Sequence, residues 1–493
     1  MATLAACGSD DGGINSDEQL ALTATEAVQA LSQGRLTAEA YVRTVLDRAQ
    51  ALAGLNAVIT LDEAGALAAA RAVDARRRSG AALPPLAGLP IIVKDNINTA
   101  HLPTTGGTAA LQHLRPSANA PTLAKLLDAG VIVIGKANLH ELSMGITSSN
   151  LTPFAGPVKN PYDTTRVPGG SSGGTAAAIA ARIVAAGLGT DTGGSVRVPS
   201  ALCGIAGLRP SVGDNLAQRR YHDENAVVPL SHTRDTIGPM GRTVADVALL
   251  DAAITGGSVP QAADLRGLRL GVPLNFWQGL DSALEPVALA AKARLAAAGV
   301  VMVGVDLSDA MALSQHISFL FGEEVLVDMP AYLAASNGGG LTFDQIRATI
   351  ASPDVRAVFD VVAGRAFEAG YPDALAVHRP ALQAMYAACF ADHGIDALLF
   401  PTTILAAVPI DAANGSSVSV INGTPANTLT TLNRNADPGS VAGLPGLSVP
   451  AGLTAGGLPV GLELDGPIGS DRRLLAIGMA IEAVLGPLPA PKV

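Results

Sequence analysis

The sequence contains little of what metal centres and disulfide frameworks require. Only three cysteines occur among 493 residues, too few and too scattered for a disulfide-stapled fold: Cys7, Cys203 and Cys389. The eight histidines are also dispersed, and neither an HExxH motif nor paired CxxC motifs are present. We therefore expect no metal site in this protein.

Charge is scarce too, and its sign is wrong for binding nucleic acid. Charged residues make up 15% of the chain, the net charge is −10, and the longest basic run is Arg76–Arg78. This composition argues against nucleic acid or an anionic membrane surface as a partner. Apolar stretches such as 397–410 are interrupted before they reach the roughly 20 residues of a membrane span. We expect no transmembrane segment, and a small molecule as the partner; a monomer and a homodimer both stay open.

The first residues resemble a bacterial lipoprotein box followed by a polar tether. The motif is Leu4-Ala5-Ala6-Cys7, but only three residues precede it, where an export signal needs a charged start and an apolar run. A trimmed signal is favoured over a chance match. The location therefore stays open between the bacterial cytoplasm and export as a lipoprotein. Residues 1–17 are expected to be disordered.

Apolar strands alternate with helical patterns along most of the chain. A capping box at Thr23–Glu26 and a threonine at position 37 begin the first two expected helices, and 61–78 is expected to be the third. Buried strands are expected at 91–93, 131–134, 268–271, 300–305, 397–400, 447–449 and 460–464, with helices at 121–129, 281–298 and 471–484. This alternation predicts an α/β fold whose sheet is covered on both faces. The stretch 411–440, rich in Asn, Gly, Ser and Thr, is expected to be a long irregular loop.

A glycine- and serine-rich loop, GGSSGG at 169–174, precedes a run of small residues. It lacks the lysine after Gly174 that a phosphate-binding loop would require. Gly169-x-Ser171-x-Gly173 formally matches the nucleophile elbow of the α/β-hydrolases, but the preceding stretch is polar and bracketed by prolines. That alternative, a Ser-His-Asp esterase, would take its base from one of four histidines without a distinctive context: His232, His316, His378 or His393.

A second such loop, Asp191-Thr192-Gly193-Gly194-Ser195, follows twenty residues later. Its flexible residues can turn several N–H groups toward one point and form an anion-binding nest. A serine beside such a nest has the parts of an acyl-transfer site, an oxygen nucleophile with oxyanion donors. A candidate base is Lys94, which ends the apolar strand 91–93: burial would disfavour the charged amine and lower its pKa. Taken alone, however, a lysine after a strand is more often a solvated strand end.

Several motifs in this order resemble the amidase signature family. They are PIIVKDN at 90–96, GGSSGG at 169–174, GTDTGGSVRVP at 189–199, GIAGLRP at 204–210, DALLFPT at 396–402 and GLPGLSVP at 443–450. The resemblance implies one large α/β amidase domain over 18–490, with a central, mixed, twisted sheet covered by helices on both faces. Its dense core spans 88–246 and its C-terminal part 396–486. The segment 247–395 carries no family motif, and substrate choice is expected to lie partly there.

The resemblance also implies a role for each site residue. Ser195 would be the nucleophile, and Ser171 would relay a proton between Ser195 and Lys94 after a cis peptide bond. Ser171 is chosen over Ser172 because it lies 24 residues before Ser195, the separation of the two serines in that family. The N–H groups of Thr192, Gly193, Gly194 and Ser195 would form the oxyanion hole. Ser172, Asp191 and Arg197 are expected to brace the loops, and no cofactor is needed.

The substrate is predicted from the stretch 140–154, which resembles the acyl-side lining of mandelamide hydrolases and aryl acylamidases. Met144, Gly145 and Ile146 would form an apolar wall. This favours small aryl or otherwise apolar amides, with carbamates (urethanes) and esters as further substrates because they present the same carbonyl. The same family includes the amidotransferase A subunit, which works inside a complex, and that non-autonomous function is the other alternative.

Overall fold

The computed structural model describes residues 14–214 and 216–493, so the lipobox-like residues Leu4–Cys7 lie outside the described chain. Its first element is helix α1 (Ser16–Ala21), which begins inside the segment expected to be disordered. The Asn15 side chain accepts a hydrogen bond from the N–H of Glu18, and the Glu18 carboxylate accepts one from the N–H of Asn15. This reciprocal capping box satisfies donors at the helix start, and the expected boundary at residue 17 is wrong by two residues.

The core of the protein is one mixed sheet of eleven strands. Parallel pairing joins β2 to β3 and β4, and β7 to β8 and β9, whereas the central strands pair antiparallel. From edge to edge the order is β1 (Val58–Leu61), β3 (Ile132–Ala137), β2 (Pro90–Lys94), β4 (Ala186–Asp191), β6 (Thr236–Gly241), β5 (Ala206–Arg209), β12 (Gly446–Leu453), β13 (Pro459–Asp465), β9 (Ala397–Pro401), β7 (Arg269–Pro273) and β8 (Val301–Val305).

Helices cover both faces of this sheet. Neighbouring residues of a strand point to opposite faces, and on β12 Leu447 lies against Gly478 of helix α18 (Asp471–Leu485). The next residue, Ser448, lies with Gly461 on the side of Ala201 in helix α7 (Arg197–Cys203). The prediction of a mixed α/β sheet covered on both faces is confirmed.

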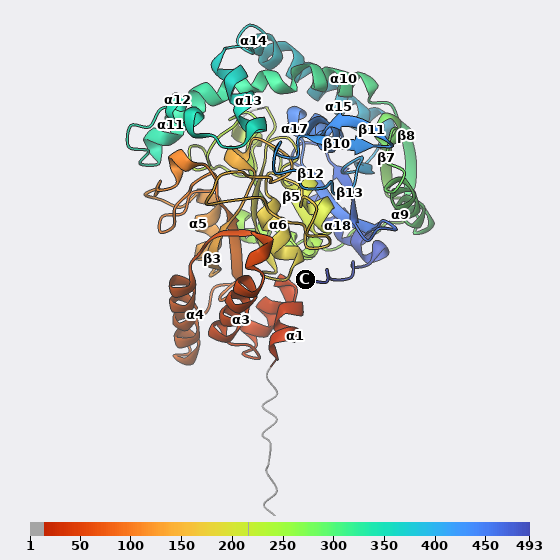
Figure 1. Ribbon diagram of the computed structural model, residues 1–493. Coiled ribbons are helices and arrows are strands. Elements are labelled where there is room, and N and C mark those ends of the chain that lie inside the picture. Colours follow the sequence, from red (N-terminus) through yellow and green to blue (C-terminus); the bar gives the residue numbers. More distant parts are fainter. Residues whose placement is uncertain (1–13, 215) are drawn as a thin grey trace, which may run out of the picture.

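Two groups of helices lie at opposite ends of the molecule (Figure 1). The N-terminal group lies at the bottom of Figure 1, and α10–α15 arch over the top. The helices not yet given bounds, in these groups and between them, are α2 (Ala24–Ser32), α3 (Ala38–Ala51), α4 (Glu63–Arg78), α5 (Pro121–Asp128), α6 (Gly173–Ala180), α8 (Val244–Thr255), α9 (Glu285–Ala297), α10 (Ser308–Ile317), α11 (Val325–Ala335), α12 (Phe343–Thr349), α13 (Pro353–Ala363), α14 (Tyr371–Asp373) and α15 (Arg379–His393). Among the described residues, no helix combines the length and apolarity needed to cross a membrane.

The stretch 411–440 is not the irregular loop that its composition predicted. It contains the hairpin β10 (Val418–Ile421) and β11 (Thr424–Asn427), then helices α16 (Thr428–Asn433) and α17 (Asp437–Ala442). Asn422 and Gly423 both adopt positive φ, the conformation that a two-residue Asn-Gly hairpin turn requires. The Asn427 side chain caps α16 by accepting from the N–H of Thr430. The polar residues are therefore turn and cap residues of short elements.

Candidate active site

Lys94 ends β2 in the middle of the sheet, and its side chain is completely buried. Its Nζ lies 2.7 Å from Ser171 Oγ and 2.7 Å from Thr190 Oγ1. Burial lowers the pKa of Lys94 to about 7, partly opposed by the more distant charges of Asp191 and Asp235. Near neutral pH a large fraction of this amine is therefore uncharged and able to accept a proton.

The loop before α6 places two serines with different contacts. The peptide bond between Gly170 and Ser171 is cis, and Ser171 Oγ faces Lys94. Ser172 points instead to β4, where its hydroxyl accepts from the N–H of Thr190 and donates to the carbonyl of Thr190. The N–H of Ser172 also donates to the carbonyl of Ser195 at 3.1 Å. Ser172 thus ties the two glycine loops together, whereas Ser171 connects to the lysine.

Ser195 follows β4 at the start of α7, and its side chain lines a cavity. Within the described chain, Ser195 Oγ has no hydrogen-bond partner, and neither do the N–H groups of Thr192, Gly193 and Ser195. The N–H of Gly194 differs, because it donates to Asp191 Oδ1 at 2.8 Å. The expected oxyanion donors are therefore reduced from four to three, since the Gly194 hydrogen already binds the carboxylate that shapes the turn.

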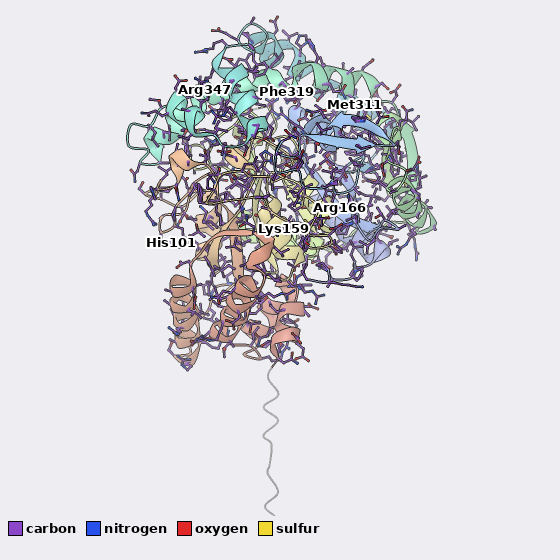
Figure 2. All side chains as sticks on the ribbon, in the orientation of Figure 1. His101, Lys159, Arg166, Met311, Phe319 and Arg347 are labelled. Carbon is purple, nitrogen blue, oxygen red and sulfur yellow. The ribbon has the colours of Figure 1, made fainter. Side chains whose placement is uncertain are left out.

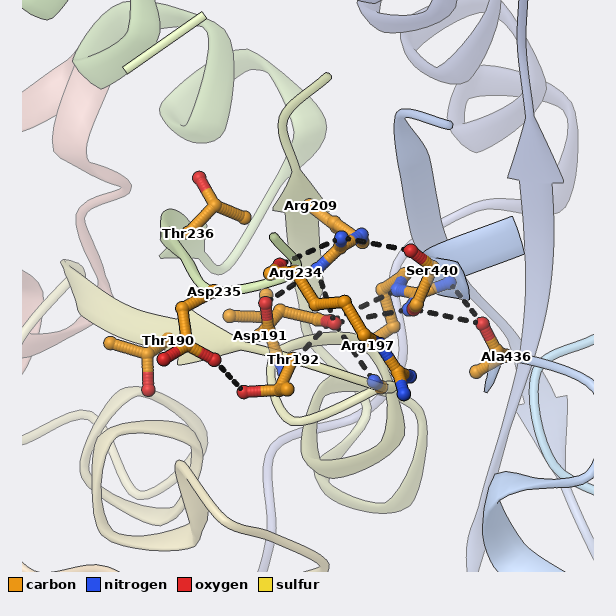
Figure 3. Close-up of polar contacts among 12 residues, drawn as sticks. Thr190, Asp191, Thr192, Arg197, Arg209, Arg234, Asp235, Thr236, Ala436 and Ser440 are labelled. Carbon is orange, nitrogen blue, oxygen red and sulfur yellow. Dashed lines mark hydrogen bonds and ion pairs between the residues drawn. The ribbon is translucent and has the colours of Figure 1, made fainter. Parts of the chain in front are cut away.

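A buried charge network holds this turn in place (Figure 3). Asp191 accepts hydrogen bonds from Gly194, from Val196 and from the guanidinium of Arg197. Arg209 donates to both the carbonyl and the carboxylate of Asp191. Burial by itself raises the pKa of Asp191, but the two guanidiniums outweigh it and hold this pKa well below its usual range. Asp191 stays charged, and the turn keeps its shape.

The cavity beside Ser195 has a volume of about 450 Å³ and mainly apolar walls. Met144, Gly145 and Ile146 all line it, so the structure brings the expected acyl wall next to the candidate nucleophile. The segment without family motifs also lines this cavity, and one of its lining side chains, Phe319, is 46% exposed (Figure 2). Its cavity-lining residues are Gln315, Ser318, Phe319, Phe321, Gly322, Val358 and Phe367.

The histidines that a Ser-His-Asp site would need lie elsewhere. Of the described residues that line the Ser195 cavity, none is a histidine. His232 lies with Glu324 and Asp328, a group of potential metal ligands in which no residue lines that cavity. The Glu324 carboxylate already accepts hydrogen bonds from Ser231, Thr233 and Tyr371. The geometry gives no support to the esterase alternative.

Three residues of the site had no assigned role in the sequence interpretation. Thr190 and Arg209 lie inside motifs that were recognised, one residue before Asp191 and near the end of GIAGLRP. Their partners, Lys94 and Asp191, become visible only once β2, β4 and β5 are assembled in one sheet, with β2 beside β4 and β6 between β4 and β5. Asn433 lines the cavity from α16, within the stretch that was expected to be a loop, and no local signal assigned it a role.

Comparisons with known proteins agree with this arrangement. A family model described as Amidase matches residues 40–475. Mandelamide hydrolase of Pseudomonas putida is 38% identical over 95% of this chain and 92% of its own length. Indoleacetamide hydrolase of Agrobacterium vitis is 40% identical over 90% of this chain and 93% of its own. A crystal structure of an amidase superposes with a TM-score of 0.81 at 33% identity, covering 94% of this chain and all of that one. The chain thus belongs to the amidase signature family and is an amidohydrolase that cleaves amide C–N bonds.

Proposed function

We propose that the protein hydrolyses small aryl or otherwise apolar amides through a seryl acyl-enzyme, with Ser195 as nucleophile, Ser171 as proton relay and Lys94 as base. One observation carries the proposal. The buried Lys94 amine, with its pKa lowered to about 7, lies 2.7 Å from Ser171 Oγ behind the loop that presents Ser195 to an apolar cavity. A lysine held neutral in this way is an effective general base at physiological pH.

The reaction then has two halves that use the same groups. Neutral Lys94 takes the proton of Ser171, Ser171 takes that of Ser195, and Ser195 Oγ attacks the substrate carbonyl. The N–H groups of Thr192, Gly193 and Ser195 stabilise the oxyanion, which is usually the largest contribution to such catalysis. The proton returns to the leaving nitrogen as the C–N bond breaks and releases the amine. Water, deprotonated through the same relay, then attacks the ester carbonyl and releases the acid and free Ser195.

The lining of the cavity supports an aromatic substrate. Phe319, Phe321 and Phe367 line the same cavity as Met144 and Ile146, and such an apolar and aromatic lining suits an aryl group. The two relatives are named for mandelamide and indoleacetamide, both amides with an aromatic group. Carbamates and esters present the same carbonyl to the same donors and belong to the proposed range. An amidotransferase subunit is the less favoured alternative, because both relatives are named as hydrolases.

The nucleophile is tested by Ser195→Ala, with Ser172→Ala as the matched control on the neighbouring loop. Ser195→Ala should reduce hydrolysis of phenylacetamide by at least about 10³-fold without changing the thermal unfolding midpoint, since the Ser195 hydroxyl has no hydrogen-bond partner among the described residues. Ser172→Ala should keep most of the activity. Ser195→Ala activity within tenfold of wild type would remove Ser195 from this role.

The acyl-enzyme is tested separately with hydroxylamine. When hydroxylamine is added to wild-type enzyme and phenylacetamide, it should compete with water and divert product to the hydroxamate, measured by its ferric complex. The amount of ammonia released should equal the sum of the acid and the hydroxamate formed. A purified chain that releases acid but never hydroxamate would contradict the covalent intermediate. A chain that hydrolyses amides only in the presence of partner subunits would favour the amidotransferase alternative.

A further inference from the structure

Asn433 is the last residue of α16, and its carboxamide lies beside Gly193 and Gly194 in the loop before Ser195. A Cβ placed on Gly193 would lie 3.1 Å from Asn433 Nδ2, and one on Gly194 would collide with Asn433 Oδ1. Asn433 lines the same cavity as Ser195. Within the described chain, its Oδ1 atom is buried and accepts no hydrogen bond. An unpaired buried acceptor costs free energy unless a ligand supplies the donor.

The chemistry around Asn433 indicates which donor is missing. The free N–H groups of the loop only donate, so they suit the carbonyl oxygen of a substrate. The carboxylate of Asp437 also lies beside Gly193, but it is paired with the guanidinium of Arg234. Asn433 Oδ1 is thus an acceptor directly beside the oxyanion donors. A substrate N–H next to the carbonyl, as in a primary or secondary amide, complements it.

We infer that Asn433 is a specificity-determining residue that accepts a hydrogen bond from the N–H of the scissile bond. It favours primary and secondary amides and N–H carbamates over esters and tertiary amides, which have no such hydrogen. A site built to bind an N–H discriminates against an analogue without it, because the buried acceptor is then left unpaired. The inference rests on the proposed function, since it assumes that the substrate carbonyl binds at the loop of Ser195.

The test compares three phenylacetyl substrates that release related chromophores: the 4-nitroanilide, its N-methyl derivative and the 4-nitrophenyl ester. Asn433→Leu keeps the side-chain volume but removes the acceptor. It should lower kcat/KM for the 4-nitroanilide by about tenfold, the value of one buried hydrogen bond. The N-methyl anilide and the ester should change by less than threefold. Asn433→Asp retains an acceptor oxygen and should preserve the ratio of anilide to ester turnover, even if every rate falls.

Each outcome has a defined meaning. Equal losses on all three substrates would overturn the inference, because they would place Asn433 on the carbonyl oxygen or in support of the loop. Ser143 is the competing residue, since its hydroxyl also lines the cavity without a partner. If the ratio of anilide to ester turnover fell in Ser143→Ala and not in Asn433→Leu, the inference for Asn433 would likewise be overturned. Ester turnover by Asn433→Leu shows that the variant is folded. A wild-type enzyme inactive on every amide and ester would instead contradict the proposed function.

Discussion

Two lysines of this protein are completely buried, on neighbouring strands, and their surroundings give them different properties. Lys136 on β3 lies 3.2 Å from the carboxylate of Asp95 and donates to the carbonyls of Ile97 and Pro103. Lys94 on β2 contacts hydroxyls, and no carboxylate of the described residues lies within ion-pair distance of it. Burial lowers the pKa of both amines, but at Lys136 the charge of Asp95 opposes it. Burial without a counter-ion is what suits Lys94 to the role of a base.

The rate of hydrolysis should therefore depend on pH through Lys94. The base must be uncharged, so kcat/KM should rise about tenfold per pH unit below pH 7 and level off above the pKa of about 7. Lys94→Ala should lose about 10²–10⁴-fold in rate and flatten the profile. Lys94→Arg should also be inactive, because a guanidinium stays protonated. Lys136→Met is the matched control, and the shape of its profile should stay unchanged.

We expect Thr190 to position Lys94, so that changes at Thr190 alter the pH dependence of the rate. Its hydroxyl oxygen accepts hydrogen bonds from Lys94 at 2.7 Å and from Asn96 at 3.0 Å. An acceptor stabilises the ammonium more than the amine, so Thr190→Val should lower the pKa of Lys94 and move the rising limb below pH 7. We expect kcat to fall by about tenfold, the value of one hydrogen bond to a charged group, with little change in KM. Thr190→Ser keeps the hydroxyl and should show the wild-type pH dependence of the rate. If the rate of Thr190→Val rose over the same pH range as that of wild type, Thr190 would not position Lys94.

At the scale of elements, helix α6 can approach the sheet only because it begins with glycines. A Cβ on Gly174 would collide with the backbone oxygen of Asn138 and lie 2.6 Å from that of Ala57. Gly174→Ala should therefore destabilise the protein by about 1–3 kcal/mol, which exceeds the helix propensity gained from alanine. Gly54→Ala is the control, since its Cβ would meet nothing within 4 Å. Thermal unfolding of both variants checks this, and equal midpoints would contradict it.

The elements also show how far the sequence could predict the structure. The buried strand before Lys94 and the expected helices were recognisable because their apolar residues keep a clear period. Lys94, Ser171 and Ser195 could be assigned to one predicted site because each lies within a short contiguous motif that the sequence shows directly. The hairpin β10–β11 was missed although Asn422-Gly423 is a hairpin signal, because Ser and Asn around it are equally common in loops. Asn433 lies beside Gly193 and Gly194 from a distant segment, and Arg209 binds Asp191 from another strand, and no local pattern shows either contact.

At the scale of the whole molecule, Arg197 joins the two halves of the sheet. Its guanidinium bonds Asp191 on β4 and, across the sheet, the carboxylate of Glu463 on β13 and the hydroxyl of Ser440 on α17. Asp465 lies 3.9 Å away. All three carboxylates are buried (Asp191 is drawn with Arg197 and Ser440 in Figure 3). Arg197 therefore links Asp191, which it shares with Arg209, to the acidic groups of β13, and the shape of the loop before Ser195 depends on strands of the C-terminal part.

Arg197→Met should be strongly destabilising because it removes the buried cation that pairs with Glu463 and one of the two that pair with Asp191. Removing one partner of a buried pair costs about 3–5 kcal/mol, measured here as a loss in the free energy of urea unfolding at pH 8. Arg347→Met is the control, because Arg347 pairs with Asp360 at the surface (Figure 2) and should leave the urea midpoint nearly unchanged.

The cost of Arg197→Met should also depend on pH, in a direction set by the carboxylates. Burial already raises the pKa of Glu463 and brings that of Asp465 to about 6, and without the cation both pKa values rise further. The native state of the variant then binds more protons than wild type between pH 8 and 5, so its stability falls more steeply as pH rises. The difference in unfolding free energy between wild type and Arg197→Met should therefore shrink on acidification from pH 8 to 5. A gap that stays constant or widens would mean that the arginine acts through packing, because lost packing carries no dependence on the protonation of its neighbours.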